Sequence, residues 1–224
     1  MTFAFWSIPA FETRTGVPEA ILCDGKSAAQ IDAILAAAGD RPLLLTRLSD
    51  RKLSELSAVA RRALDYDPLS RTAFHGAAAT SRRRGAGIVC AGTSDLPVAR
   101  EAARMLTFSG FEAPIIADVG VAGLWRLMNR LDEIRSFSVV IAVAGMEGAL
   151  FSVLAGLIAA PVIAVPTSVG YGVASGGRAA LSSALASCAS GLVAVNIDNG
   201  FGGACAAIRM LRQTWEKAAP KTSS

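Results

Sequence analysis

The sequence has few aromatic side chains, a single histidine and no paired cysteines, and each shortage argues against a class of protein. Aromatic residues make up 6% of the 224 residues and hydrophobic residues 52%, a balance that favours close packing of helices on a sheet. The cysteines at 23, 90, 188 and 205 include no CxxC pair, so neither a zinc site nor a disulfide framework is indicated. His75 lies far from the glycine-rich loops of the second half of the chain, which argues against a Ser-His or Cys-His catalytic pair.

The chain also has no apolar run long enough to cross a membrane. The longest candidate, "GALFSVLAGLIAAPVIAVP", is interrupted by Pro161, and the part before the proline is too short to span a bilayer. The first ten residues carry no basic leader and no clean cleavage signal. We therefore expect a soluble, cytoplasmic protein with no membrane partner.

The charge is mildly positive, with a formal net charge of +4. Its strongest cluster is the run at 82–84, which consists of three arginines with no interleaved aromatic side chains. A nucleic-acid site normally combines both features, so we interpret the run as a solvated linker and expect no nucleic-acid partner.

From residue 87 onward, short apolar runs alternate with helical patterns. Strands are predicted at 87–92, 113–120, 138–145, 161–167 and 191–197, and helices at 94–108, 122–134, 147–160, 177–188 and 203–218. Strands that are apolar on both faces and alternate with helices predict an α/β fold, a doubly wound parallel sheet with helices on both faces.

The first 80 residues predict a small α/β unit. Apolar runs at 18–23 and 41–46 indicate strands, and the patterns at 27–39 and 50–64 indicate helices. We place the small domain at 1–80 and the main domain at 85–218, joined through the segment "GAAATSRRRGAG".

Glycines and polar residues follow each strand of the main domain. Ligands of doubly wound sheets bind beyond the carboxyl ends of the strands, and glycine-rich loops let backbone amides approach an anionic group. Gly92, Thr93 and Ser94 are candidates to hold a phosphate or carboxylate, and Asp95 is expected to cap the following helix. Further candidates for substrate binding are Asp118, Gly145, Met146, Gly148, Ser168, Tyr171, Gly172, Asn196, Asp198 and Asn199.

Two reactive side chains allow two interpretations each. Glu147 stands at a predicted helix start in an apolar region; it is either a carboxylate that complements the helix dipole or a general acid–base group. Cys188 precedes a strand and taken alone is a small core residue, whereas a nucleophilic role requires a stabilised thiolate.

Taken in series, six motifs of the main domain make the chain resemble the LarB family, the carboxylase/hydrolase of nickel-pincer-cofactor biosynthesis. They are "AGTSDLPVA", "DVGVAGL", "VAGMEGAL", "PVIAVPTSVGYG", "SCASG" and "VNIDNGFG". The resemblance is dense from Gly87 to about Ala206 and continues more thinly over "RTGVPEAILCDGKSAAQI". The C-terminal domain of that family is similar to the aminoimidazole ribonucleotide carboxylases of purine synthesis.

The resemblance implies a reaction and its residues. Family members carboxylate C5 of the pyridinium ring of nicotinic acid adenine dinucleotide with carbon dioxide or bicarbonate. They also hydrolyse its phosphoanhydride, which yields pyridinium-3,5-biscarboxylic acid mononucleotide and AMP. The family's covalent cysteine corresponds to Cys188, its serine to Ser94 and its acidic residue to Glu147. The resemblance further implies Mg²⁺, no tightly bound organic cofactor, and a homo-oligomer, an octamer by analogy.

Two alternatives stay open at this point. The first is an aminoimidazole ribonucleotide carboxylase or mutase, although that group relies on an active-site histidine and none of the loops supplies one. The second is a catalytically silent nucleotide-binding homologue on the same scaffold.

Overall fold

The computed structural model describes residues 12 and 14–218 and contains two β-sheets. The larger sheet has five strands in the order β6-β5-β7-β8-β9, and all neighbours pair in parallel. Its strands are β5 (Ala86–Cys90), β6 (Ile115–Ile116), β7 (Val139–Ala144), β8 (Val162–Pro166) and β9 (Leu192–Ala194). The predicted doubly wound parallel sheet is thereby confirmed.

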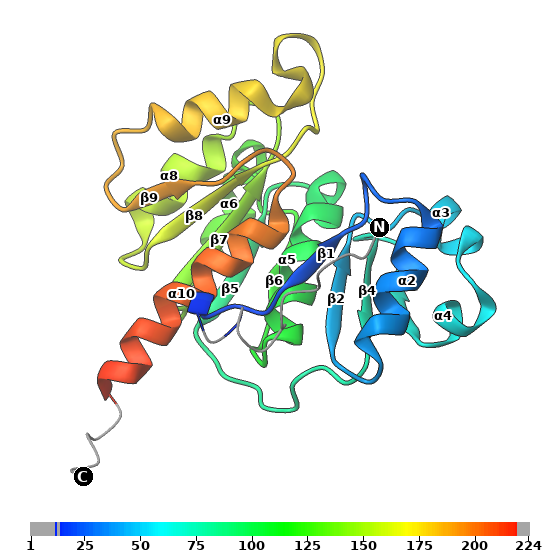
Figure 1. Ribbon diagram of the computed structural model, residues 1–224. Helices are drawn as coiled ribbons and strands as arrows, with labels where there is room; N and C mark the ends of the chain where they lie inside the picture. The colour runs from blue at the N-terminus through cyan, green and yellow to red at the C-terminus, as the bar shows by residue number, and fades with distance from the viewer. Residues whose placement is uncertain (1–11, 13, 219–224) are drawn as a thin grey trace.

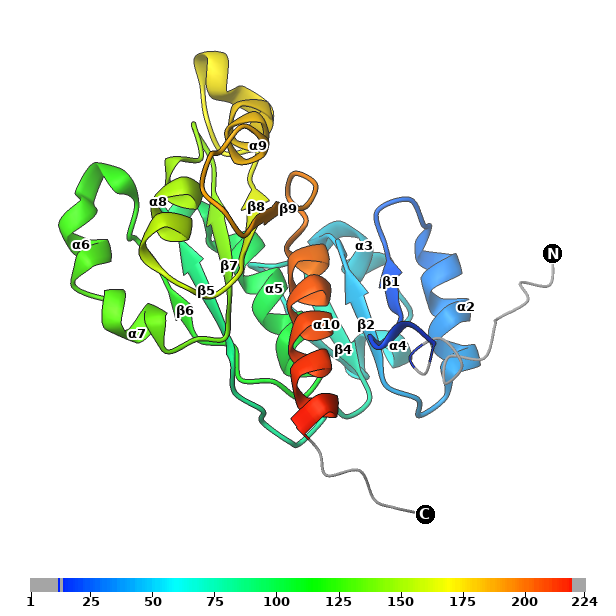
Figure 2. The ribbon, with the colours of Figure 1, turned by 90° about the vertical axis from the view of Figure 1, so that its left-hand side faces the viewer.

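Helices cover both faces of this sheet (Figures 1 and 2). One face packs on α5 (Leu96–Phe108) and α10 (Gly200–Ala218). The other face packs on helices that include α8 (Ala149–Leu157) and α9 (Arg178–Leu185). The central strands β5, β7 and β8 are buried at every residue, which explains why their sequences are apolar without alternation.

The smaller sheet lies on the far side of α5, so that α5 is sandwiched between the two sheets (Figure 2). Its strands are β1 (Ala20–Leu22), β2 (Leu43–Thr46), β3 (Leu64–Asp67) and β4 (Thr72–His75), in the order β1-β2-β4-β3. Only β1 and β2 pair in parallel. Leu44 joins the core around α5, whereas Leu43 and Leu45 pack with α2 (Ala28–Ala38) on the opposite face, as the alternation of a strand requires.

Two predicted helices are wrong in their length. The pattern at 50–64 folds as α3 (Asp50–Glu55) and α4 (Ala58–Arg62), because the Ser57 side chain caps a new helix and its own backbone amide donates to the carboxylate of Asp32 at 3.0 Å. The pattern at 122–134 likewise divides into α6 (Leu124–Met128) and α7 (Leu131–Arg135). Strands β3 and β4 were not predicted at all.

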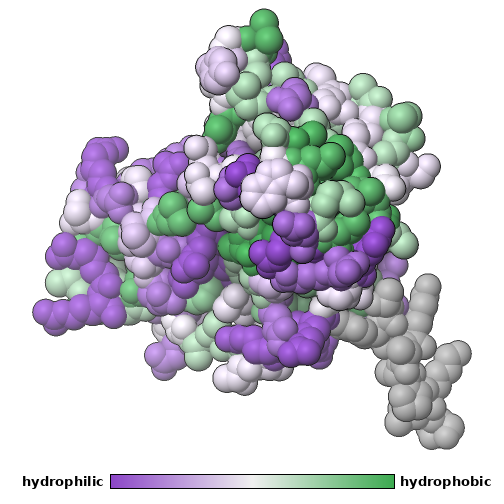
Figure 3. Space-filling model, turned by 180° about the vertical axis from the view of Figure 1, so that it is seen from behind, coloured by the Kyte–Doolittle hydropathy of each residue, from purple (hydrophilic) through white to green (hydrophobic). Residues whose placement is uncertain are grey.

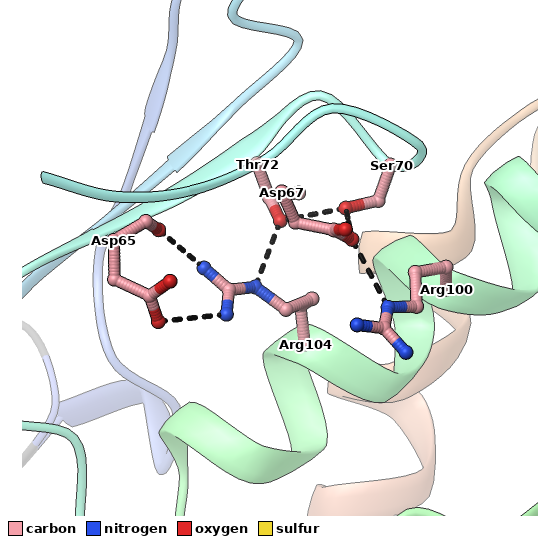
Figure 4. A network of polar contacts seen from close by, with 6 residues as sticks. All are labelled: Asp65, Asp67, Ser70, Thr72, Arg100 and Arg104. Carbon is pink, nitrogen blue, oxygen red and sulfur yellow. Dashed lines mark hydrogen bonds and ion pairs between the residues drawn. The ribbon is translucent and has the colours of Figure 1, made fainter.

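A polar network fastens the β3–β4 hairpin to α5 (Figure 4). Arg104 of α5 donates to the carboxylate of Asp65 at 2.9 Å and to Thr72 Oγ1 at 3.2 Å. Its guanidinium also lies 3.6 Å from the centre of the Phe74 ring. One turn earlier on the helix, Arg100 donates to Asp67 at 3.1 Å. The small sheet is therefore attached to the main domain by specific contacts as well as by apolar packing.

In the described part of the chain, every helix is too short or too polar to span a membrane.

Candidate active site at the carboxyl edge of the large sheet

The loops that follow β5 and β8 are joined through Asp95 and Thr167. Asp95 ends the short 3-10 helix η1 (Thr93–Asp95), and Thr167 directly follows β8. The buried Thr167 hydroxyl donates to Asp95 Oδ1 at 2.6 Å, and the Gly92 amide donates to Asp95 Oδ2 at 3.0 Å. These two hydrogen bonds hold the loop after β5, which contains Ser94, against the loop after β8.

Asp95 does not cap the following helix as expected. It occupies the position before α5, but its carboxylate makes no capping hydrogen bond there, because both of its oxygens are turned toward Gly92 and Thr167. Burial raises the pKa of Asp95, and the hydrogen bonds from Thr167 and Gly92 oppose this shift without cancelling it. Asp95 does not line the cavity; it holds the neighbouring loops in place through its hydrogen bonds to Gly92 and Thr167.

A cavity of about 290 Å³ opens where these loops face the small sheet. From the main domain, Ser94, Ser168 and Asp198 line it, each from the loop that follows a different strand. The Ser168 amide donates to the carboxylate of Asp198 at 2.8 Å. The N-terminal unit contributes Arg47 and Arg71 to the lining. The structure thus brings three of the predicted site residues together.

The loop after β7 lies beside this cavity without being among the residues that line it. The Met146 amide donates to the carbonyl of Val169, a lining residue, at 2.8 Å. A side chain at Gly145 would meet that same carbonyl oxygen at 2.2 Å, so only glycine fits there. Glu147 follows in this loop and is exposed rather than enclosed by apolar side chains. Gly148, in the left-handed conformation with φ 66°, leads into α8.

Several other predicted site residues have local roles or lie away from the cavity. Asp118 pairs with Arg126 at 3.3 Å. The Asn199 side chain accepts from the Gly202 amide at 2.8 Å at the start of α10, and the Asn196 side chain accepts from the next amide of its own turn. Thr93, Tyr171, and Gly172 are exposed and are not among the lining residues.

Cys188 lies at the opposite edge of the sheet. It falls between the end of α9 and the start of β9, and the carbonyl of nearby Gly191 accepts from the amide of Val162, the first residue of β8. Parallel strands bring all their amino ends to one edge, so Cys188 of one chain lies away from the loop that carries Ser94. It is closer to the helix that follows Glu147, because the neighbouring Ser187 hydroxyl lies 2.7 Å from that of Ser152 in α8.

The Cys188 thiol is nevertheless the exposed one among the free cysteines at 23, 90, 188 and 205. Burial raises the pKa of the Cys90 and Cys205 thiols to about 12 and that of Cys23 to about 11, and thiols of such pKa stay protonated and inert near neutral pH. Of the four, Cys188 is the most open to a reagent or a second molecule.

The sequence interpretation missed Arg47, Arg71 and Glu101 as parts of the site. Glu101 is buried in α5, where it accepts a hydrogen bond from the Thr46 hydroxyl and another from the Phe201 amide at 3.1 Å. Arg47 follows Thr46 directly at the end of β2. Applying the rule of polar strand ends to the small sheet as well as to the large one would have found Arg47.

The residues present do not form a metal site of the usual kind. Among the described residues, no three histidine, cysteine, aspartate or glutamate side chains are grouped so that they could hold a metal ion. Mg²⁺ is usually held by one or two carboxylates together with waters and substrate phosphates, so the Mg²⁺ that the resemblance implies stays a prediction.

A doubly wound sheet that gathers hydroxyl and carboxylate groups at its carboxyl edge, beside guanidinium groups of the N-terminal unit, defines an α/β protein with a site for a small polar ligand. A family model described as AIR carboxylase matches residues 86–223, and a second, described as LarB/PurE-like N-terminal domain, matches residues 11–77. The chain belongs to the AIR carboxylase family, as a LarB-like member with that N-terminal domain. The family indicates a carboxylase-type enzyme.

An uncharacterized protein of the archaeon Methanocaldococcus jannaschii is similar to part of this chain. The two sequences are 50% identical over 118 residues, which is 52% of this chain and 45% of the relative. The matched segment therefore covers less than half the length of that relative.

Proposed function

We propose that this protein carboxylates C5 of the pyridinium ring of nicotinic acid adenine dinucleotide and hydrolyses the phosphoanhydride of that dinucleotide. The products are pyridinium-3,5-biscarboxylic acid mononucleotide and AMP. The observation that carries the proposal is the composition of the cavity, because residues of the N-terminal unit, which the LarB-type model matches, line it together with Ser94.

The chemistry needs a nucleophile, because a pyridinium ring is electron-poor and does not attack carbon dioxide. Addition of the Cys188 thiolate to C4 moves an electron pair onto the ring and makes C5 an enamine-like carbon. C5 then attacks carbon dioxide and gains a carboxylate. A base removes the C5 proton, the thiolate leaves from C4, and the ring regains its aromaticity. The net change is the replacement of one ring hydrogen by a carboxylate, with release of one proton.

Two further side chains have roles in this sequence of steps. Glu147, which is exposed beside the cavity loop, is the candidate base for the C5 proton. Ser94, which lines the cavity, donates a hydrogen bond to the incoming carboxylate. In the hydrolysis, water attacks one phosphorus of the anhydride and the other phosphate leaves, so that two monophosphates form.

The position of Cys188 implies that two copies of the chain build one reacting site. Since Cys188 and Ser94 lie at opposite edges of the same sheet, the thiolate of one copy has to reach the cavity of another, in the homo-oligomer expected by analogy. Exposed apolar side chains favour such association: Leu124, Trp125 and Met128 of α6 are 43%, 67% and 46% exposed. Figure 3 shows hydrophobic residues as a continuous area on the face that carries α6.

Incubation with the dinucleotide and ¹³C-labelled bicarbonate tests the activity. We expect a labelled mononucleotide together with AMP, measured by mass spectrometry of the small molecules. Carboxylation of aminoimidazole ribonucleotide in place of the dinucleotide would contradict the proposal, and so would the absence of any labelled product. His75 speaks against the imidazole substrate, because its ring contacts the Gly39 carbonyl at 2.6 Å in the small sheet rather than the cavity.

Co-expression of two inactive variants tests the sharing of the site. Ser94→Ala and Cys188→Ala chains each lack one group, but an oligomer that contains both restores an intact pair in about a quarter of its sites. We therefore expect the mixed oligomer to recover about a quarter of the wild-type activity. If each chain carried a complete site of its own, the mixture would stay as inactive as its parts.

A further inference from the structure

The cationic part of the cavity comes from two loops of the N-terminal unit. Arg47 follows β2 and Arg71 precedes β4, and the carbonyl of Arg71 accepts from the Leu48 amide at 2.8 Å, which holds the two loops together. Both arginines are exposed and line the same cavity as Ser94.

The backbone at both arginines is in the left-handed region, with φ 55° at Arg47 and 52° at Arg71. Among the described residues only five other than glycine adopt positive φ, and three of them, Arg47, Arg71 and Asp198, line this one cavity. Such conformations cost free energy in residues with a side chain and gather where function requires them. The backbone strain is therefore concentrated around the cavity. The left-handed conformation sets the direction in which each arginine side chain leaves the backbone.

Neither guanidinium is neutralised by a carboxylate. Arg47 donates to the backbone carbonyl of Asp198 at 3.0 Å, and the Arg71 guanidinium has no hydrogen bond or ion pair with any described residue. By contrast, Arg100 and Arg104 of the neighbouring helix are each paired with an aspartate. The charge of the two cavity arginines is thus left for a ligand.

Three acidic side chains also line the cavity, and none of them forms a salt bridge with Arg47 or Arg71. The carboxylate of Asp198 accepts the Ser168 amide, and that of Glu101 accepts the Thr46 hydroxyl and the Phe201 amide. Asp24 also lines the cavity and is exposed to solvent. Two guanidinium groups and the Ser94 hydroxyl line a cavity of about 290 Å³ and offer the hydrogen-bond donors and the space that a phosphate or pyrophosphate group needs.

We propose that Arg47 and Arg71 bind the phosphates of the substrate, so that the N-terminal unit is the phosphate-binding half of the site. The inference rests on the proposed function insofar as that function supplies a phosphorylated pyridinium substrate. Arginine suits this task because its planar fork donates two parallel hydrogen bonds to phosphate oxygens. With the phosphates held on one wall, the pyridinium end of the substrate extends toward the loops of the large sheet.

Calorimetric binding in bicarbonate-free buffer tests the inference with Arg47→Asn and Arg71→Asn. Asparagine tolerates positive φ better than most residues, so the charge is removed while the backbone conformation is kept. Arg51→Asn is the matched control, because Arg51 belongs to the same unit, pairs only with Glu55 on the surface of α3 and does not line the cavity. The probes are nicotinic acid adenine dinucleotide, inorganic pyrophosphate and nicotinic acid riboside, which carries no phosphate.

We expect each cavity variant to bind the dinucleotide and pyrophosphate about tenfold more weakly or worse. The control variant should bind like the wild type, and riboside binding should change less than about twofold in every variant. Dinucleotide affinity of Arg71→Asn equal to that of the wild type would overturn the inference, as would a wild-type protein that binds neither phosphorylated probe. If Arg71→Asn lowers the melting temperature, Arg71→Gln, which keeps more of the stem, is judged by the same criterion.

The two proposals fail in different ways. Loss of phosphate-dependent binding in the arginine variants, without any labelled product in the wild type, leaves the phosphate site standing and removes the carboxylation. Labelled product in the wild type, together with unchanged dinucleotide affinity in the arginine variants, supports the carboxylation and removes the phosphate site.

Discussion

The Thr167 hydroxyl and the Asp95 carboxylate form a buried hydrogen bond of 2.6 Å between the loops after β8 and β5. This contact connects two non-adjacent strand ends and sets the position of Ser94, which is the residue next to Asp95. Because both partners are buried, its loss affects the stability of the fold as well as the shape of the site.

Thr167→Val should lower the free energy of unfolding by about 1–3 kcal/mol at neutral pH, since it leaves a buried carboxylate oxygen without its donor. Urea unfolding measures the change. Ser168→Ala is the control, because the neighbouring Ser168 engages Asp198 through its backbone amide, which the substitution keeps. Equal stability of Thr167→Val and the wild type would show that the bond does not hold the two loops.

Asp95 also predicts a dependence of stability on pH. Burial raises its pKa in the folded state above the ordinary value of 3.8, so between these two pKa values the folded protein binds more protons than the unfolded chain. The contribution of Asp95 to stability is therefore complete below about pH 4 and is lost as the pH rises through the folded-state pKa.

Asp95→Asn removes this titration. Relative to the wild type, the asparagine variant should become less destabilised as the pH rises from 4 to 7.5, measured by urea unfolding at several pH values. A difference between the two proteins that stays constant over this range, or that grows with pH, would contradict the assignment.

Arg104 connects α5 to the small sheet through several polar contacts and one aromatic ring. Arg104→Ala removes the bonds to Asp65 and Thr72 and the stacking on Phe74, and we expect a loss of about 2 kcal/mol in the free energy of unfolding. Arg100→Ala should cost less than about 1 kcal/mol, because the Arg100 side chain is 49% exposed. Proteolysis followed by mass spectrometry would detect earlier release of the N-terminal unit in Arg104→Ala, and equal losses in the two variants would refute this ranking.

Much of the main domain could be predicted from the sequence, because its strands are buried on both faces and their apolar runs are bounded by glycines. The small sheet was harder. Strand β3 reads Leu-Asp-Tyr-Asp and has one exposed and three half-buried positions, so its pairing with β4 depends on tertiary contacts with Arg104 and not on a local pattern. The same holds for the end of α3, which depends on the distant carboxylate of Asp32.

The site was predicted in part. Ser94, Ser168 and Asp198 do meet at one cavity, because polar residues at the carboxyl ends of parallel strands share an edge. The arginines were missed. Arginine is not a residue type that indicates a positive φ, so the unusual backbone conformation of Arg71 could not be predicted from the sequence. Cys188 was expected among these residues, but its motif precedes β9, and a residue before a strand lies at the amino edge. The sequence already placed Cys188 before the strand predicted at 191–197, so the shared amino edge of parallel strands would have separated it from Ser94.

Glu147→Gln separates binding from chemistry. The substitution keeps the size of the side chain but removes the proposed base, so carboxylation should fall by about 10²–10⁴-fold while calorimetry shows unchanged affinity for the dinucleotide. Because Glu147 is exposed and no described residue forms a salt bridge with it, the fold should not be affected. Unchanged product formation in Glu147→Gln would remove this residue from the mechanism.

The most direct measurement is the intact mass of the protein after incubation with nicotinic acid adenine dinucleotide. We predict a covalent adduct that peptide mapping locates at Cys188 and that is absent from Cys188→Ala. The adduct should persist in Cys205→Ala, because burial raises the pKa of the Cys205 thiol and keeps it protonated. An unmodified wild-type mass under conditions in which labelled product accumulates, or an adduct that survives in Cys188→Ala, would contradict the covalent mechanism.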